Sequence, residues 1–159
     1  MDVMEAIRKR RSIRAYKNEP ISDEILQKLL TAGQLAPTGN NKQPWKLIVV
    51  RDPEMRKKIN DACAQDFIGD APVILVACSS KEPKDMNTTI VVDHITLVAV
   101  AEGLGSCWIR SFDEAKIKEL LDIPEEIHVV CLLPIGYPAE NPEMPERKPL
   151  SELVSYEKY

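Results

Sequence analysis

Apolar residues recur at two different spacings along this chain of 159 residues, which predicts both helices and strands. Apolar positions three and four apart indicate amphipathic helices. Four polar residues are placed to cap such helices at their first turn: Asp2, Ser22, Asp52 and Asp113. The first helix would close on the basic residues 8–11, which suit a helix C-terminus, and Pro37 and Pro124 would lie past the ends of two others.

Runs of apolar and β-branched residues predict strands over residues 45–51, 73–80, 106–112 and 127–136. Pro134 would mark the end or an edge of the last strand, because proline cannot donate to a neighbouring strand. Residues 90–102 are almost all apolar, and their length and the glycines that follow favour a buried helix. Residues 81–89 are predicted to form a polar loop.

The last 22 residues, 138–159, differ in character from the rest of the chain. Residues 138–149 hold four prolines and have no apolar periodicity, so they cannot form a helix. Residues 150–156 (LSELVSY) could form a last strand. Because strands alternate with helices before this tail, the expected class is α/β or α+β with a layered sheet.

Composition narrows the class of protein. The chain length suits a single domain with one core. Twenty-five acidic residues against twenty-one basic ones give a net charge of −4, which argues against a general nucleic-acid binder. No apolar run approaches the roughly 18 residues of a membrane span. The N-terminus lacks the apolar centre of a secretory signal, so we expect a cytoplasmic protein.

The cysteines and histidines do not predict a catalytic or metal site. No two cysteines are close enough for a Cys-x-x-Cys motif, and most lie within apolar segments, which favours buried reduced thiols. Two histidines make a histidine-rich metal site unexpected, and neither lies in a recognisable dyad motif. The residues concerned are Cys63, Cys78, Cys107, Cys131, His94 and His128.

Three polar stretches could bind a ligand. Residues 10–14 (RRSIR) offer cations and a hydroxyl that suit a phosphate, although taken alone they are better explained as a solvated basic helix end. Residues 36–45 (APTGNNKQPW) form a long connection rich in amides and hydroxyls. A basic pair, Arg147 and Lys148, lies in the proline-rich tail. Gly103 and Gly105 follow a predicted helix and lack a third glycine, so they are not a dinucleotide fingerprint.

Together these stretches resemble the nitroreductase family of FMN-dependent flavoproteins. Four segments match in order: RRSIR with a following tyrosine, APTGNNKQPW, GLGSCWIRSFDEAKIKELLDIP and the C-terminal RKPLSELVSYEKY. The resemblance implies an α+β fold, with a central mixed β-sheet of four to five strands between helices in three layers (α/β/α). It also implies a homodimer with FMN sites at the subunit interface, and a C-terminal extension (residues 138–159) that packs on the partner subunit.

The resemblance implies roles for specific residues, carried over by position. Residues 10–12 would hold the FMN phosphate and ribityl chain, and Arg14 would face the pyrimidine edge of the flavin. Residues 37–41 would approach the flavin from the partner subunit, residues 110–111 would offer a backbone N–H near flavin N5, and Arg147 would complete the phosphate site. The implied cofactor-binding residues are Arg10, Arg11, Ser12, Arg14, Pro37, Thr38, Gly39, Asn41, Arg110, Ser111 and Arg147.

The implied activity is an oxidoreductase with a ping-pong mechanism. NAD(P)H would reduce the bound FMN and leave, and an electron-poor small molecule such as a nitroaromatic or a quinone would then take the electrons. The flavin would carry the chemistry, so no catalytic side chain is needed. Many relatives have glycines where this chain has Arg110 and Ser111, and a longer cover where it has residues 81–89. A flavin-binding sensor or carrier with little turnover is therefore the alternative, and a nucleic-acid module using residues 8–14 is a second.

Overall fold

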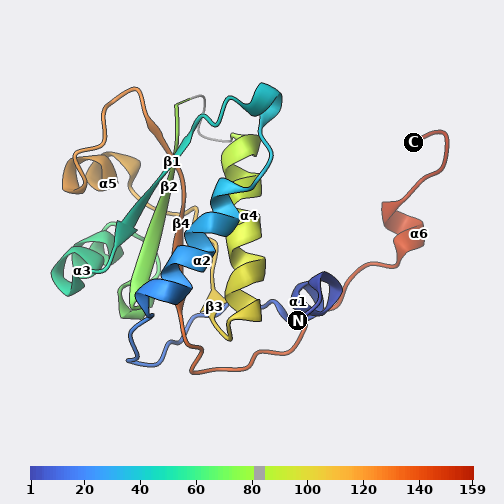
Figure 1. Ribbon diagram of the computed structural model, residues 1–159, viewed down its shortest axis with the longest axis horizontal. Coiled ribbons are helices and arrows are strands. Elements are labelled where there is room, and N and C mark those ends of the chain that lie inside the picture. The colour runs from blue at the N-terminus through green and yellow to red at the C-terminus, as the bar shows by residue number, and fades with distance from the viewer. Residues whose placement is uncertain (81–84) are drawn as a thin grey trace.

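A four-stranded antiparallel sheet forms the centre of the computed structural model, which describes residues 1–80 and 85–159 (Figure 1). The strand order across the sheet is β1-β2-β4-β3. The strands are β1 (Trp45–Val50), β2 (Val73–Ser79), β3 (Gly105–Ser106) and β4 (His128–Gly136). The predicted strands over residues 45–51, 73–80 and 127–136 are confirmed to within a residue of their bounds.

Helices cover both faces of this sheet, as the three-layer expectation requires (Figure 1). Helices α2 (Asp23–Gln34) and α4 (Met86–Ala101) lie on one face, and α3 (Pro53–Asp61) and α5 (Glu114–Leu120) lie on the other. Helix α1 (Val3–Lys9) packs beside α4, and α6 (Leu150–Leu153) lies in the tail. Two short 3-10 turns are Gly39–Asn41 and Ile68–Asp70.

The alternation of side chains along β2 and β4 produces two separate cores. Leu75 and Leu133 point toward α2 and α4, whereas Val76 and Leu132 point toward α3 and α5. All four side chains are at most 1% exposed. A strand buried on both faces reads as a continuous apolar run, which is why β2 and β4 were readily predicted from the sequence.

The helix starts follow the predicted caps. The side chains of Asp2, Ser22, Asp52 and Asp113 each accept a hydrogen bond from the backbone N–H three residues later, at 2.7 to 3.3 Å. Helix α4 begins at Met86 and not at residue 90, because Asp85 caps it. Residues 86–89, expected in a polar loop, therefore form its first turn, and residues 81–84 of that loop lie outside the described part of the chain.

The sheet differs from the mixed sheet that we expected. All three pairings between named strands are antiparallel, and the one parallel contact among the described residues is the isolated bridge between Ser12 and Ser106. The predicted strand over residues 106–112 shrinks to β3. The N–H of Cys107 donates to the carbonyl of Pro134 at 3.3 Å, but Pro134 has no N–H to return the bond, and pairing resumes only at a bridge between Ile109 and Leu132.

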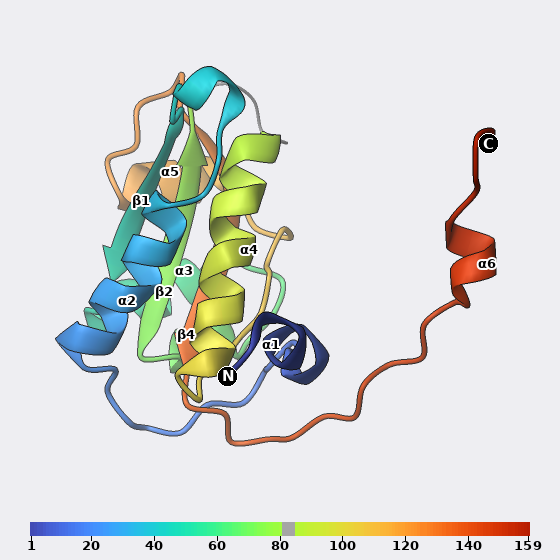
Figure 2. The same cartoon turned by 45° about the vertical axis from the view of Figure 1, so that its right-hand side comes forward.

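Ala139 and Glu140 still bond to Ala15 and Arg14, and the tail that follows leads away from the body of the molecule (Figure 2). Residues 138–149 contain no helix, as predicted. The strand predicted over residues 150–156 is wrong: Leu150–Leu153 forms α6, and residues 154–156 are not in a strand. A strand needs a neighbour to receive its backbone hydrogen bonds, and the tail lies away from the sheet of its own chain. No helix within the described residues is long and apolar enough to cross a membrane.

Candidate functional site

The basic segment over residues 10–14 lies beside the C-terminal end of α4. The N–H of Ile13 donates to the carbonyl of Ser106 at 3.0 Å, next to the parallel bridge between Ser12 and Ser106. The hydroxyl of Tyr16 donates toward the carbonyls of Ile13 at 2.7 Å and Pro134 at 3.2 Å. Burial raises the pKa of this phenol, so Tyr16 remains a neutral donor that ties the segment to β4.

The cations of this segment are not neutralised by carboxylates. Within the described part of the chain, no ion pair includes Arg10, Arg11 or Arg14, and only the backbone N–H of Arg14 contacts the carboxylate of Glu140. Arg11 turns back toward α1, where its Nη1 donates to the carbonyls of Arg8 and Arg10 at 2.7 and 2.6 Å. Its buried Nε has no partner in the structure.

This donor set fits a phosphate group. Unpaired guanidinium groups and the hydroxyl of Ser12 form strong, charge-assisted hydrogen bonds to anionic oxygens. Cys107, whose thiol lies near Ser12, is an improbable nucleophile here: burial raises its pKa, and Arg14 offsets the increase only in part. The structure therefore favours the ligand-binding interpretation of residues 10–14 over a simple solvated helix end.

The second predicted segment lies at the opposite end of α4. Thr38 and Gly39 open the 3-10 turn after α2, and the N–H of Gly39 donates to Oδ1 of Asn87 in the first turn of α4 at 2.9 Å. Pro37, Gly39 and Asn41 are exposed. Figure 2 shows this turn at the upper end of α4 and α1 at its lower end.

The length of α4 separates the two halves of the predicted site. From Asn87 to Ala101 the helix rises by about 21 Å at 1.5 Å per residue. Residues 10–14 and 37–41 are therefore not brought together within one chain. This separation agrees with the expectation that the loop residues approach a flavin held by the other subunit.

The remaining predicted residues lie in two further places. Arg110 and Ser111 are exposed and follow the irregular pairing with β4, and the carbonyl of Ser111 accepts from the N–H of Ala64 at 3.3 Å. Arg147 lies in the exposed tail, where its Nη1 donates to the carbonyls of Pro145 at 2.9 Å and Glu146 at 3.3 Å. It contacts none of the other predicted residues in its own chain.

A buried carboxylate beneath the loop over residues 37–41 was not identified from the sequence. Asp85 is 3% exposed, and its Oδ2 accepts from the hydroxyls of Ser79 at 3.0 Å and Thr88 at 2.7 Å. Its Oδ1 accepts from Nδ2 of Asn87 at 2.7 Å. The spacing of Asp85 before Asn87 and Thr88 is a capping pattern, and reading it as one would have indicated the helix start.

Asp85 makes the stability of the protein depend on pH. Burial would raise the pKa of this carboxyl, but the hydrogen bonds from Thr88, Asn87 and Ser79 outweigh burial and lower it. A group with a lowered folded-state pKa contributes stability above its unfolded pKa of about 3.9 and loses it as the pH falls further. Asp85→Asn should therefore cost about 1–3 kcal/mol of unfolding free energy at pH 7.

Urea titrations of both proteins at pH 7 and pH 3 test this expectation. The difference between wild type and variant should shrink at pH 3, because below the unfolded pKa of about 3.9 the unfolded chain takes up a proton at Asp85 while the lowered pKa disfavours it in the folded chain. The control is Asp93→Asn, which changes an exposed carboxylate on the same helix. An equal difference at both values of pH would contradict the assignment.

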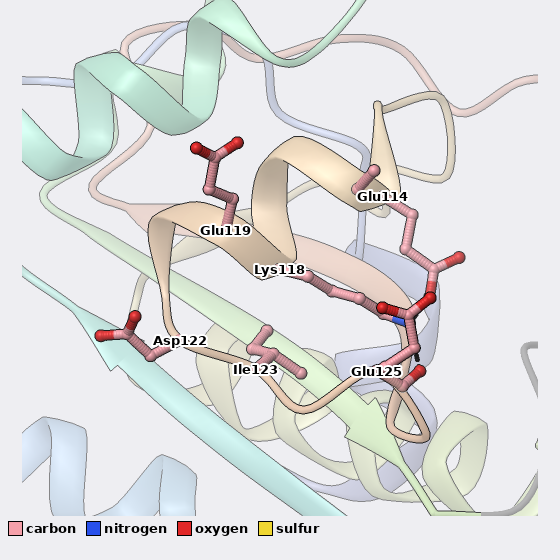
Figure 3. Close-up of a pocket in the computed structure, with 7 residues that line it drawn as sticks. Glu114, Lys118, Glu119, Asp122, Ile123 and Glu125 are labelled. Carbon is pink, nitrogen blue, oxygen red and sulfur yellow. Dashed lines mark hydrogen bonds and ion pairs between the residues drawn. The ribbon is translucent and has the colours of Figure 1, made fainter.

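The hollow along α5 is distinct from both halves of the predicted site (Figure 3). Its volume is about 660 Å³, and Glu114, Glu119, Asp122 and Glu125 lie around it. The ammonium of Lys118 lies 3.4 Å from Glu114 and donates to the carbonyl of Glu125 at 2.9 Å, so this cation is already paired. An acidic hollow of this kind repels a phosphate, and it contains none of the predicted site residues.

Comparison with known proteins identifies the same family as the motifs. Residues 2–159 match the family model described as "Putative TM nitroreductase". A protein of Archaeoglobus fulgidus named "Putative NADH dehydrogenase/NAD(P)H nitroreductase" is 37% identical over 157 residues, which cover 91% of this chain and 90% of that protein.

Two solved structures share the fold along their whole length. A nitroreductase family protein of Clostridium difficile 630 is 36% identical, with a TM-score of 0.90 and full coverage of both chains. An FMN-dependent nitroreductase of Clostridium difficile R20291 is 30% identical, with a TM-score of 0.86 and coverage of 98% of this chain and 99% of that one. With the α+β architecture, the order of the motifs and the match over residues 2–159 in agreement, this chain belongs to the nitroreductase family of oxidoreductases.

Proposed function

We propose that the protein is a homodimeric FMN-dependent oxidoreductase that takes a hydride from NAD(P)H and passes electrons to an electron-poor small molecule. The acceptor class is nitroaromatic, quinone or similar, and the nicotinamide leaves before the acceptor binds. The bound flavin supplies the redox chemistry, accepting a hydride and then returning electrons. The residues of the chain bind and orient that group and its two substrates. We expect this to take place in the cytoplasm.

One observation carries the proposal most strongly: among the described residues, the guanidinium groups near the C-terminal end of α4 form no ion pair with a carboxylate. Arg10 and Arg14 lie with Ser12 beside the backbone of Ser106, where a phosphate and a ribityl chain would find donors. Unpaired positive charges repel each other, so their accumulation in an acidic protein is explained by an anionic ligand. Residues 110–111 follow Ser106 along the chain and would present a backbone N–H to the flavin.

The proposal of a homodimer is supported by two features of the single chain: the segments of the predicted site lie apart, and the tail is exposed. The loop over residues 37–41 lies about 21 Å along α4 from the basic segment of its own chain. The tail exposes Leu150, Leu153 and Tyr156, which belong to neither core cluster of the described residues. Exposed apolar residues grouped in this way are typical of a protein–protein interface. We propose that residues 138–159 pack on the partner subunit as an extension of a single FMN-binding domain.

Flavin reduction tests the activity directly. The purified protein is expected to be yellow or to bind added FMN, and anaerobic stopped-flow mixing with NADH or NADPH in separate runs should bleach the flavin. Reoxidation by a quinone or a nitroaromatic should then restore the absorbance. Flavin that binds but is bleached by neither nicotinamide would favour the sensor or carrier, and absence of FMN binding would contradict the whole proposal.

Arg147→Ala is expected to weaken FMN binding. Loss of one charge-assisted hydrogen bond to the phosphate should cost about 1–3 kcal/mol of binding free energy. Titration of FMN fluorescence measures the dissociation constant. Lys158→Ala, which removes another exposed cation of the tail, serves as the control. An unchanged dissociation constant for Arg147→Ala would remove Arg147 from the site.

A further inference from the structure

The loop between α2 and β1 holds a conformation that its own residues disfavour. Asn40, Asn41 and Gln43 have φ values of 52°, 53° and 48°, in the left-handed region that non-glycine residues rarely adopt. Such residues persist only where surrounding contacts impose the conformation. Two bonds inside the loop help: Thr38 Oγ1 accepts from the N–H of Gln43 at 3.0 Å, and its carbonyl accepts from the N–H of Asn41 at 2.9 Å.

In the described part of the chain, one hydrogen bond joins the turn that holds these strained residues to another element. Among the described residues, the bond from the Gly39 N–H to Asn87 Oδ1 is the one that connects residues 38–43 to the rest of the fold. Asn87 is half-buried in the first turn of α4, outside every segment that resembles the family. Ser80 fixes the end of the loop, since its N–H and hydroxyl donate to the carbonyl of Pro44 at 2.9 and 3.3 Å. The position of the turn around Gly39 therefore depends on the orientation of the Asn87 amide.

Asp85 fixes the orientation of the Asn87 amide. Nδ2 of Asn87 donates to Oδ1 of Asp85 at 2.7 Å, and a carboxylate accepts but does not donate, so the amide oxygen must face Gly39. Asp85 is itself held by Ser79 and Thr88, both at most 1% exposed. A buried network with every member satisfied is rigid, so it transmits a fixed position to the loop.

We propose that Asn87 is a positioning residue that holds the loop over residues 38–41 in the conformation that contacts the flavin of the partner subunit. This inference rests on the proposed function. Asn87 acts through the backbone of Gly39 and need not touch the flavin. Pre-ordering the loop removes the entropy cost of fixing it when FMN binds, so the affinity for FMN should depend on Asn87.

Asn87→Ala and a matched control test the proposal in the full-length protein. The variant should exchange the Gly39 amide hydrogen about tenfold faster or more, since this N–H loses its acceptor. It should also weaken FMN binding by about five- to tenfold, the loss of one hydrogen bond. Thr89→Ala removes a side-chain bond to the Asp85 carbonyl (3.0 Å) in the same helical turn without facing the loop, and should leave both quantities near wild type.

Asn87→Asp tests the orientation of the amide. Aspartate keeps an oxygen toward Gly39 but cannot donate to Asp85 and places a second carboxylate beside the first, so it should behave like Asn87→Ala. The proposal is overturned if Asn87→Ala leaves exchange or FMN affinity unchanged, if Thr89→Ala weakens FMN equally, or if Asn87→Asp matches wild type. Failure of the proposed function would look different, because the wild-type protein itself would then not bind FMN. That result would also overturn the role of Asn87 in flavin binding. Hydrogen exchange at the Gly39 amide would still show whether Asn87 holds the loop.

Discussion

Gly105→Ala is expected to destabilise the protein and to abolish tight flavin binding. A Cβ on Gly105 would collide with Cγ1 of Ile13 and would lie 2.8 Å from its Cβ, closer than real side chains approach. Ile13 is 5% exposed and bonded through its N–H to Ser106, so it cannot move without shifting the basic segment. Overpacking of this kind costs about 1–3 kcal/mol.

The loss of FMN affinity should exceed what the loss of stability alone would cause. Residues 10–14 pass directly over β3, so displacing Ile13 also displaces the neighbouring Arg14 and Ser12. Urea unfolding gives the stability, and fluorescence titration of FMN below the unfolding transition gives the affinity. Adding Ile13→Ala to the variant removes the Cγ1 that meets the new Cβ, and should recover part of the stability as a non-additive gain. If the Gly105→Ala protein folds and binds FMN with wild-type affinity, the contact between Ile13 and Gly105 does not position the flavin site.

The parts of the fold that the sequence predicted are those where local chemistry decides. The helix starts at Asp2 and Asp52 depend on a hydrogen bond between the side chain and a backbone N–H three residues later. Because both partners lie within one short stretch of sequence, the sequence pattern alone predicts the contact. The same holds for β2 and β4, whose continuous apolar runs follow from burial on both faces. Tertiary context has little to change at such positions.

Apart from the start of α4, where the local cap at Asp85 was missed, the predictions that were wrong involve partners distant in sequence. The strand expected over residues 106–112 is cut short because Pro134, more than twenty residues away, cannot donate to Cys107. The strand expected over residues 150–156 finds no neighbour within its own chain, and its first half is helical. Antiparallel pairing throughout the sheet, in place of a mixed arrangement, is also a property of topology that no local pattern encodes.

The candidate site shows the same division. The cations and the hydroxyl of residues 10–14 could be recognised in the sequence as suited to a phosphate. The other three segments were recognised because they resemble the family in the same order along the chain. Their separation along α4 could not be predicted, since it depends on how the helix is placed between the two segments. Asp85 and Asn87 were hidden within a stretch that looked like an ordinary polar loop. Their importance comes from a hydrogen bond to Gly39, which lies 48 residues earlier.

Leu133→Ala, on the side of β4 that faces α2 and α4, should produce a large loss of stability. The side chain is 0% exposed, Leu133 pairs with Leu75 of β2, and both belong to the same core cluster as Ile95 of α4. Truncating a buried leucine removes its transfer free energy and leaves a cavity, at a combined cost of about 2–5 kcal/mol. Leu35→Ala, at a leucine that is 75% exposed, should change stability by no more than about 0.5 kcal/mol.

Urea unfolding at a fixed protein concentration shows whether Leu133→Ala destabilises the protein by leaving a cavity. A cavity lowers the midpoint and leaves the slope of the transition unchanged, because the surface exposed on unfolding hardly differs. Concentration must be fixed because a dimer gains stability by mass action. Since this core supports α4 along its length, Leu133→Ala should also loosen the helix whose two ends carry the two halves of the site. A loss below about 1 kcal/mol would mean that this side of the sheet closes around the missing atoms, and that α4 is held mainly by contacts outside this core.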